Sequence, residues 1–358
     1  MKKYLFVAVC VLVIAGCKQK QGQTAGDTPQ ADSVKTEMAV EGKQFTPAEI
    51  GNGWAAKDIK VPNGGEQPDI VTLLRAFDKV WPTQSAKLLL GMAADRQSQS
   101  INRDTGGGML IDYNNGFVDV TPGDAPGDIL RGAVWKRSNG HRLFGLYLYT
   151  PQKDYAGIPD GEALCFYDYD PKTETMTPEK DNAISKLQPS KDNFLRYEFP
   201  RMGQDMLVGD SDSEYNTKWH VFAWDGKDFS EETAYTDDEL RSAVVGFWKN
   251  TDKSLPFSFR ITAGEEGWPT ITDCGSIADN MAYEAHVLCD NGLMVVSEQT
   301  TKGYDDEEEE TPPFEPSLVC YFRLTKDGRL TGGYYIKQGD GKERKGIMTM
   351  EKQNQRND

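Results

Sequence analysis

The spacing of apolar residues predicts one short helix in the first hundred residues of the chain. Five apolar residues recur at intervals of three or four: Ile70, Leu73, Leu74, Phe77 and Val80. Such a stripe is typical of a helix that packs one face on a core. Because Asp69 is a good N-cap and Pro82 ends the run, we expect a helix over residues 69–81.

Beyond about residue 105 the pattern changes to an alternation of apolar and polar residues, which is typical of strands. Five dipeptides place Gly where a tight hairpin needs a positive φ: Asn115-Gly116, Asn139-Gly140, Asp225-Gly226, Asn291-Gly292 and Asp327-Gly328. Residues 143–149 and 219–224 are apolar on both faces and should lie in the centre of covered sheets. Phe257, Phe259 and Ile261 alternate with polar residues, as in a half-buried strand. The chain is therefore predicted to be mainly β, with two antiparallel β-rich domains, each a sandwich or a small barrel, and a short N-terminal helix.

A polar segment around residues 230–239 separates two blocks of strands. It predicts a domain over residues 46–235, which contains the helix, and a second domain over residues 236–352. The second block opens with Gly246-Phe247-Trp248, which is similar to the first strand of lipocalin-type barrels, where the Trp closes one end. A core tryptophan on any first strand would give the same three letters.

The N-terminus has the pattern of a signal peptide. Met1-Lys2-Lys3 is basic, and residues 4–16 are apolar. Thirteen helical residues rise only about 20 Å, less than the roughly 30 Å of a hydrocarbon core. The run is therefore interpreted as the apolar region of a signal peptide over residues 1–16, and not as a membrane span.

The end of this run, Ile14-Ala15-Gly16-Cys17, resembles the lipobox of bacterial lipoproteins. The resemblance implies that Cys17 is the first mature residue and carries the lipid; an ordinary secretory signal cut elsewhere is the alternative. Residues 17–45 are then a disordered tether, which spans about 25–30 Å on average. Lys18-Gln19-Lys20 shows neither an inner-membrane nor a surface-export signal of this class, so the resemblance places the protein on the periplasmic face of the outer membrane.

The charge of the chain restricts its partners. It has 40 basic and 56 acidic residues, a net charge of −16. Loss of Lys2 and Lys3 leaves 38 basic residues against 56 acidic ones, or −18. A nucleic-acid partner is excluded, since a phosphate backbone needs a basic face. An acidic body also has little attraction for an anionic membrane, so the membrane is a partner only through the lipid.

Four cysteines remain after the first two are assigned to the signal peptide and the lipid: Cys165, Cys274, Cys289 and Cys320. Disulfides are permitted outside the cytoplasm. A bridge Cys274–Cys289 or Cys289–Cys320 and a set of buried free thiols are both consistent with the pattern.

No motif for catalysis, metal binding or a cofactor is found in the sequence. There is no Cys-x-x-Cys or His-Glu-x-x-His, and the three histidines (His141, His220 and His286) show no metal spacing. We therefore predict no catalytic residues, no metal and no cofactor. Trp268, in a turn-like segment, is the best candidate for an exposed ligand contact. Tyr147 and Tyr149 share a strand face and could stack on a sugar, or could instead cover a core with their hydroxyls at its rim.

Together these patterns predict a lipid-anchored envelope protein with a non-catalytic binding or assembly role, whose partner is an envelope protein or a glycan. One alternative is a glycan-directed hydrolase that draws its carboxylates from distant strands. A structural spacer is the other. Two carboxylates about 5–10 Å apart across an aromatic-lined cleft would favour the hydrolase.

Overall fold

The computed structural model describes residues 43–93, 99–102, 108–121, 127–152, 155–212, 216–264, 268–275, 283–300, 316–337 and 343–353. The predicted signal peptide, Cys17 and the tether up to residue 42 lie outside the described residues. Within the described ranges, the helices are all too short or too polar to cross a bilayer.

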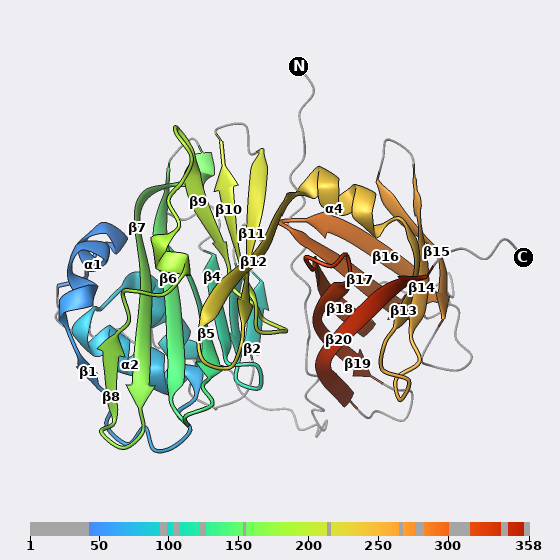
Figure 1. Ribbon diagram of the computed structural model, residues 1–358. Helices are drawn as coiled ribbons and strands as arrows, with labels where there is room; N and C mark the ends of the chain where they lie inside the picture. Colours follow the sequence, from blue (N-terminus) through green and yellow to red (C-terminus); the bar gives the residue numbers. More distant parts are fainter. Residues whose placement is uncertain are drawn as a thin grey trace, which may run out of the picture.

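The structure is built from four layers (Figure 1): helices, an eight-stranded sheet, a four-stranded sheet and a barrel. The helical layer contains α1 (Pro47–Gly53), η1 (Trp54–Ala56), α2 (Ile70–Val80) and α3 (Gln84–Met92). The first sheet, here called sheet A, has the antiparallel order β1-β8-β7-β6-β5-β4-β3-β2. Its strands are β1 (Ile59–Lys60), β2 (Gln99–Asn102), β3 (Gly108–Asp112), β4 (Phe117–Thr121), β5 (Ile129–Lys136), β6 (Arg142–Gln152), β7 (Tyr155–Asp170) and β8 (Thr175–Pro178).

The four-stranded sheet, here called sheet B, follows the short helix η3 (Ile184–Lys186) and has the order β12-β11-β10-β9. Its strands are β9 (Phe194–Glu198), β10 (Met206–Ser211), β11 (Thr217–Trp224) and β12 (Phe229–Thr236). Helix α4 (Asp237–Val244) then leads into the barrel.

The barrel is a single antiparallel sheet in the order β15-β14-β13-β20-β19-β18-β17-β16. Its strands are β13 (Gly246–Asn250), β14 (Ser258–Ala263), β15 (Pro269–Gly275), β16 (Tyr283–Asp290), β17 (Leu293–Thr300), β18 (Pro316–Leu324), β19 (Leu330–Lys337) and β20 (Glu343–Gln353). The two end strands, β15 and β16, lie in contact, so the barrel is nearly closed. The prediction of a mainly β, antiparallel chain with a short N-terminal helix is confirmed.

Helix α2 forms for the reason that its sequence indicates. The Asp69 side chain accepts a hydrogen bond from Thr72 N at 2.7 Å, which satisfies one of the free N–H groups of the first turn. Leu73, Leu74 and Phe77 are fully buried against sheet A. The helix therefore closes one apolar face of that sheet.

Sheet A is covered on both faces, as the sequence of β6 predicts. Phe144, Leu146 and Leu148 pack in the cluster under the helices. Leu143 and Tyr147 point the other way, into the cluster shared with sheet B. Alternate side chains of one strand thus contribute to two cores.

Sheet B is also buried on both faces. On β11, Phe222 and Trp224 pack against sheet A, whereas Trp219 and Val221 pack in the cluster of the barrel. Tyr235 of β12 reaches the barrel as well, since its hydroxyl donates to Gly292 O at 2.8 Å. Sheet B therefore joins the two halves of the molecule.

The barrel begins with a buried tryptophan. Trp248 of β13 has no exposed surface, and its indole N–H donates to Val244 O, at the end of α4, at 2.7 Å. Phe259 and Phe322 lie beside it in the same interior cluster. Thr236 caps α4 and ends β12, and β13 begins at Gly246, so α4 connects sheet B to the barrel.

Candidate functional site

Tyr147 and Tyr149 lie side by side on β6, with ring centroids 5.1 Å apart and nearly parallel planes. Tyr147 is only 3% exposed and packs on Tyr197 of sheet B at 4.7 Å. Its hydroxyl donates to Glu162 Oε2 at 2.9 Å, and burial raises its pKa well above the usual value. Of the two interpretations that the sequence leaves open for Tyr147, the geometry agrees with a core tyrosine whose hydroxyl lies at the rim, because the ring is part of the core between the two sheets.

Arg131 of β5 lies beside this tyrosine pair and holds two carboxylates. Its Nη1 is 3.0 Å from Glu198 Oε2 of sheet B, and its Nε is 3.5 Å from Asp119 Oδ2 of β4. The charge of Glu198 raises the pKa of Arg131, and burial raises the pKa of Asp119 against the effect of Arg131. Each of the three side chains is about a quarter exposed. Both carboxylates pair with the same cation, so Arg131 links sheet A to sheet B through its ion pair with Glu198.

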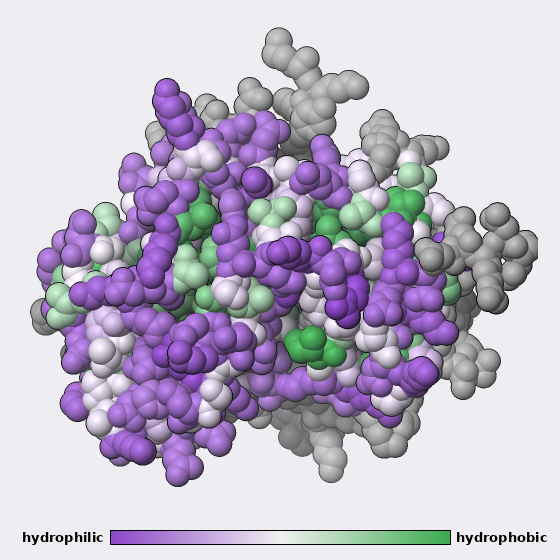
Figure 2. Space-filling model, in the orientation of Figure 1, coloured by the Kyte–Doolittle hydropathy of each residue, from purple (hydrophilic) through white to green (hydrophobic). Residues whose placement is uncertain are grey.

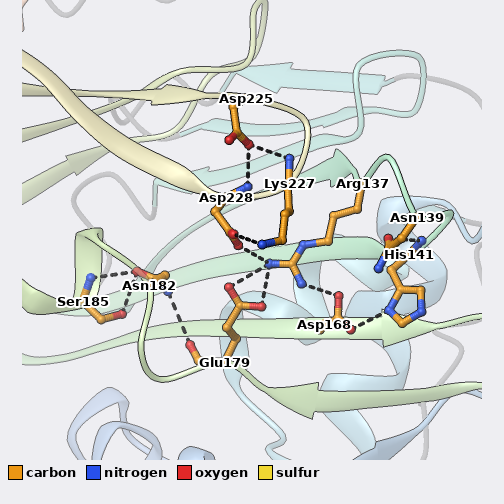
Figure 3. Close-up of polar contacts among 10 residues, drawn as sticks. All are labelled: Arg137, Asn139, His141, Asp168, Glu179, Asn182, Ser185, Asp225, Lys227 and Asp228. Atoms are coloured by element: carbon orange, nitrogen blue, oxygen red, sulfur yellow. Dashed lines mark hydrogen bonds and ion pairs between the residues drawn. The ribbon is translucent and has the colours of Figure 1, made fainter.

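A second arginine, Arg137, lies between sheets A and B at the other end of β5 (Figure 3). Arg137 follows β5 directly, and its side chain is 9% exposed. Its Nη1 donates to Asp168 Oδ1 of β7 at 2.5 Å, and its Nη2 donates to Glu179 Oε2 at 2.6 Å and Oε1 at 2.8 Å. Asp228, in the turn between β11 and β12, lies 3.5 Å from the same nitrogen. The Arg137 guanidinium thus pairs with carboxylates from three segments that are distant in the sequence.

The remaining residues of Figure 3 hold the loops of this cluster in place. His141 Nδ1 lies 2.7 Å from Asp168 Oδ2, so this histidine is paired and not simply solvated. Asp225 Oδ1 accepts bonds from Lys227 N and Asp228 N, and shapes the turn that carries Asp228. Asn182 shapes the segment that follows Glu179 in a similar way, since its Oδ1 accepts a hydrogen bond from Ser185 N at 2.8 Å. These contacts position ion pairs, and none brings a nucleophile next to a base.

The arginine clusters could not be assigned from motifs, but one of them left a signal in the sequence. Arg131 shares a strand face with Ala133 and Trp135, both of which are buried. A charge in the middle of an apolar strand face needs a partner. The segments that supply the partners are 12 to 67 positions away, so their identity could not be inferred.

Trp268 lies at the surface, directly before β15, and is 48% exposed. The guanidinium of Arg241 stacks 4.5 Å above its ring, and Arg241 Nη1 donates to Asp238 Oδ1 at 2.6 Å. Asp238 also lines a shallow depression of about 480 Å³ on α4, with Glu239 and Ser242. The indole is therefore exposed and also held in a fixed orientation beside this shallow depression.

Neither of the two alternative bridges that the sequence leaves open, Cys274–Cys289 or Cys289–Cys320, forms. Cys289 is a buried, free thiol, and burial raises its pKa to about 12. In the barrel, Cys289 lies opposite Met294, and Cys320 lies opposite Val296 on the other side of β17. Two strands separated by a third are about 9–10 Å apart, beyond the reach of a disulfide. The side chain of Cys274 lies outside the described residues.

The part of the chain that the structure describes contains no group of His, Cys, Asp and Glu side chains suited to a metal ion. On the face shown in Figure 2, hydrophilic residues cover most of the coloured surface, and apolar residues emerge in small separate patches. Comparisons of the chain with models of protein families, with curated proteins and with solved structures gave no match.

Proposed function

We propose that the chain is a lipid-anchored cell-envelope protein that binds a partner without catalysing a reaction, and that Trp268 is one of its contacts. The anchor rests on the lipobox-like Ile14-Ala15-Gly16-Cys17. The binding role rests on a single structural observation, the exposed indole of Trp268 fixed by Arg241. Tryptophan is among the residues that contribute most to binding energy at interfaces, and its flat face also stacks on sugar rings.

The way in which carboxylates are grouped supports binding over hydrolysis. A glycosidase needs one carboxylate as an acid and another as a base or nucleophile, both facing the substrate. The clusters at Arg131 and Arg137 instead turn their carboxylates toward a guanidinium. Neither the depression at Glu232 and Arg329 nor the one on α4 is lined by a residue of either cluster.

The anchor and the contact are tested in one set of strains. Cys17→Ser should move the protein from the membrane to the soluble fraction, and retention in the membrane would contradict the anchor. Binding of the soluble Cys17→Ser chain to envelope fractions should fall about tenfold or more with Trp268→Ala, the loss expected for a central aromatic contact. Ile347→Ala is the matched control, since Ile347 is 55% exposed on β20. Equal binding of the two variants would refute the role of Trp268.

A further inference from the structure

Strand β20 has a free edge where it runs past the end of its neighbour β13. The strand β13 pairs only with residues 350–353 of β20, and Thr251, directly after β13, donates from its backbone N to Thr349 O at 2.9 Å. The chain then leaves β20 in a turn over residues 252–255. The first part of β20, residues 343–346, pairs with β19 on one side and has no strand on the other within the described residues. Because the turn stands in line with β13, a strand laid against β20 has room only along residues 343–346.

The backbone groups of this segment alternate between the two sides of β20. A residue of an antiparallel strand directs its N–H and C=O to one neighbour, and the next residue directs them to the other. Since Thr349 accepts from the β13 side, Lys345 and Glu343 direct their backbone groups to that side as well. The hydroxyl oxygens of Thr331 and Thr349, 3.0 Å apart, agree with this phase, because side chains approach most closely in the pairs without ladder bonds. Both Glu343 and Lys345 are exposed, and no described residue bonds to these backbone groups, so the edge is open to an added strand.

The charges of the segment favour one kind of partner. Arg344 and Lys345 are exposed and form no ion pair with a described residue, and Lys345 Nζ makes one long contact of 3.5 Å, to Asn114 O. Glu343 is the only carboxylate of the segment, so two cations stand against one anion, on a chain with a net charge of −16. Two copies paired through this edge would bring like charges together, which is unfavourable. A negatively charged partner strand gains instead.

The geometry of the strand also determines how the negative charges must be spaced. Arg344 and Lys345 are consecutive, so their side chains point to opposite faces of the sheet. A partner strand then needs one carboxylate on each face, which two consecutive acidic residues supply. We infer that the free edge of β20 binds an extended segment of a partner protein that contains two consecutive acidic residues. This inference goes beyond the proposed function, because Trp268 takes no part in it.

Two labelled hexapeptides of equal composition, Thr-Val-Glu-Glu-Val-Thr and Thr-Glu-Val-Glu-Val-Thr, test the inference by fluorescence anisotropy with the soluble Cys17→Ser chain. Only the first peptide places its carboxylates on opposite faces, so it should bind about two- to fivefold more tightly, the effect of one exposed ion pair. Lys345→Gln should weaken binding of the first peptide by about the same factor. The matched control is Lys218→Gln, which removes an exposed lysine from β11 of sheet B and should leave binding unchanged.

A proline at the same position tests the backbone bond. Lys345→Pro removes the N–H of the edge together with the charge, and should weaken binding about fivefold more than Lys345→Gln does, the effect of one lost hydrogen bond. Lys345 does not bond to β19 through its backbone, so the proline leaves that ladder intact. Thermal melts establish that the variants fold, and the two peptides with Lys345→Gln decide the inference even if Lys345→Pro does not.

Four results would overturn the inference. The first is no binding of either peptide up to about 1 mM, a concentration that detects even weak affinity. The second is equal binding of the two peptides, or an unchanged affinity in Lys345→Gln, since the cations would then not select the partner. The third is equal binding by folded Lys345→Pro and Lys345→Gln, since no strand would then be added at the edge. The fourth is a dimer in sedimentation that Lys345→Pro dissociates, which would assign the edge to a second copy of the chain.

Discussion

Replacing Arg137 with Met tests whether one guanidinium holds one end of the sandwich together. The side chain is 9% exposed and makes three short hydrogen bonds, to Asp168 and Glu179. Burial opposes the charged form, but the two carboxylates outweigh it and raise the pKa of Arg137. A raised pKa of a cation stabilises the fold below the ordinary pKa of that cation, so the contribution of Arg137 is present at neutral pH, where the carboxylates that cause it are ionised.

The expected cost follows from what the substitution leaves behind. Removing one partner of a buried ion pair costs about 3–5 kcal/mol, because the other partner stays buried without its counter-charge. The Asp168 and Glu179 side chains are 24% and 22% exposed, so water can solvate them in part. We therefore expect the lower end of the range, about 3 kcal/mol of unfolding free energy. For a chain of this size this corresponds to a fall of roughly 4–6 °C in Tm.

Urea unfolding followed by tryptophan fluorescence measures the change, since Trp135 and Trp224 lie in the cluster between sheets A and B. Lys227→Met is the matched control. Lys227 belongs to the same group of charges, 3.2 Å from Asp228, but its side chain is 76% exposed. Exposed pairs contribute about 0–1 kcal/mol, so the control should be nearly neutral. A cost below about 1 kcal/mol for Arg137→Met, or an equal cost for both variants, would refute the reasoning.

Two further predictions concern the Glu162 carboxyl and the Cys289 thiol. Burial raises the pKa of Glu162 above its usual 4.5, so the unfolded chain loses this proton first and stability falls as the pH rises through that region. Glu162→Gln, which still accepts the bond from Tyr147, should therefore stabilise the protein at about pH 7 and not at about pH 3.5, and an equal effect in urea titrations at both pH values would contradict this. Cys289 should resist iodoacetamide at about pH 8 in the folded chain and react fully after unfolding without reductant, because burial, assisted by the charges of Asp237 and Asp290, raises its pKa to about 12. A Cys289 peptide that remains cross-linked in mass spectra of the unfolded chain would show a disulfide instead.

Local signals in the sequence were sufficient where the structure depends on neighbouring residues. The cap at Asp69 and the apolar stripe that follows it predicted α2, and the structure has that helix over Ile70–Val80. The glycines of all five predicted hairpin dipeptides have a positive φ: Gly116, Gly140, Gly226, Gly292 and Gly328. Such turns depend on backbone conformations that few residues other than glycine adopt, so two letters are enough to predict them.

The candidate sites depend on residues far apart in the sequence, and there the local signals failed. The partners of Arg137 come from positions 168, 179 and 228, each on a different segment. Tyr147 and Trp268 are both candidate contacts from the sequence, yet one is buried between sheets and the other is exposed. The apolar sequence of β6 predicts that both faces of the strand are covered, but it does not show that sheet B supplies the cover over Tyr147.

Sheet B also joins the two halves of the molecule into one body. Trp219 and Val221 pack in the barrel cluster, while Phe222 and Trp224 pack against sheet A, so both halves have an apolar interface with the same sheet. Arg323 adds ion pairs across this junction, to Asp205 and Glu232. A hinge motion would expose these side chains to water, so the two halves should move as one body. Under the proposed function, the folded body would therefore supply a rigid surface to bind the partner.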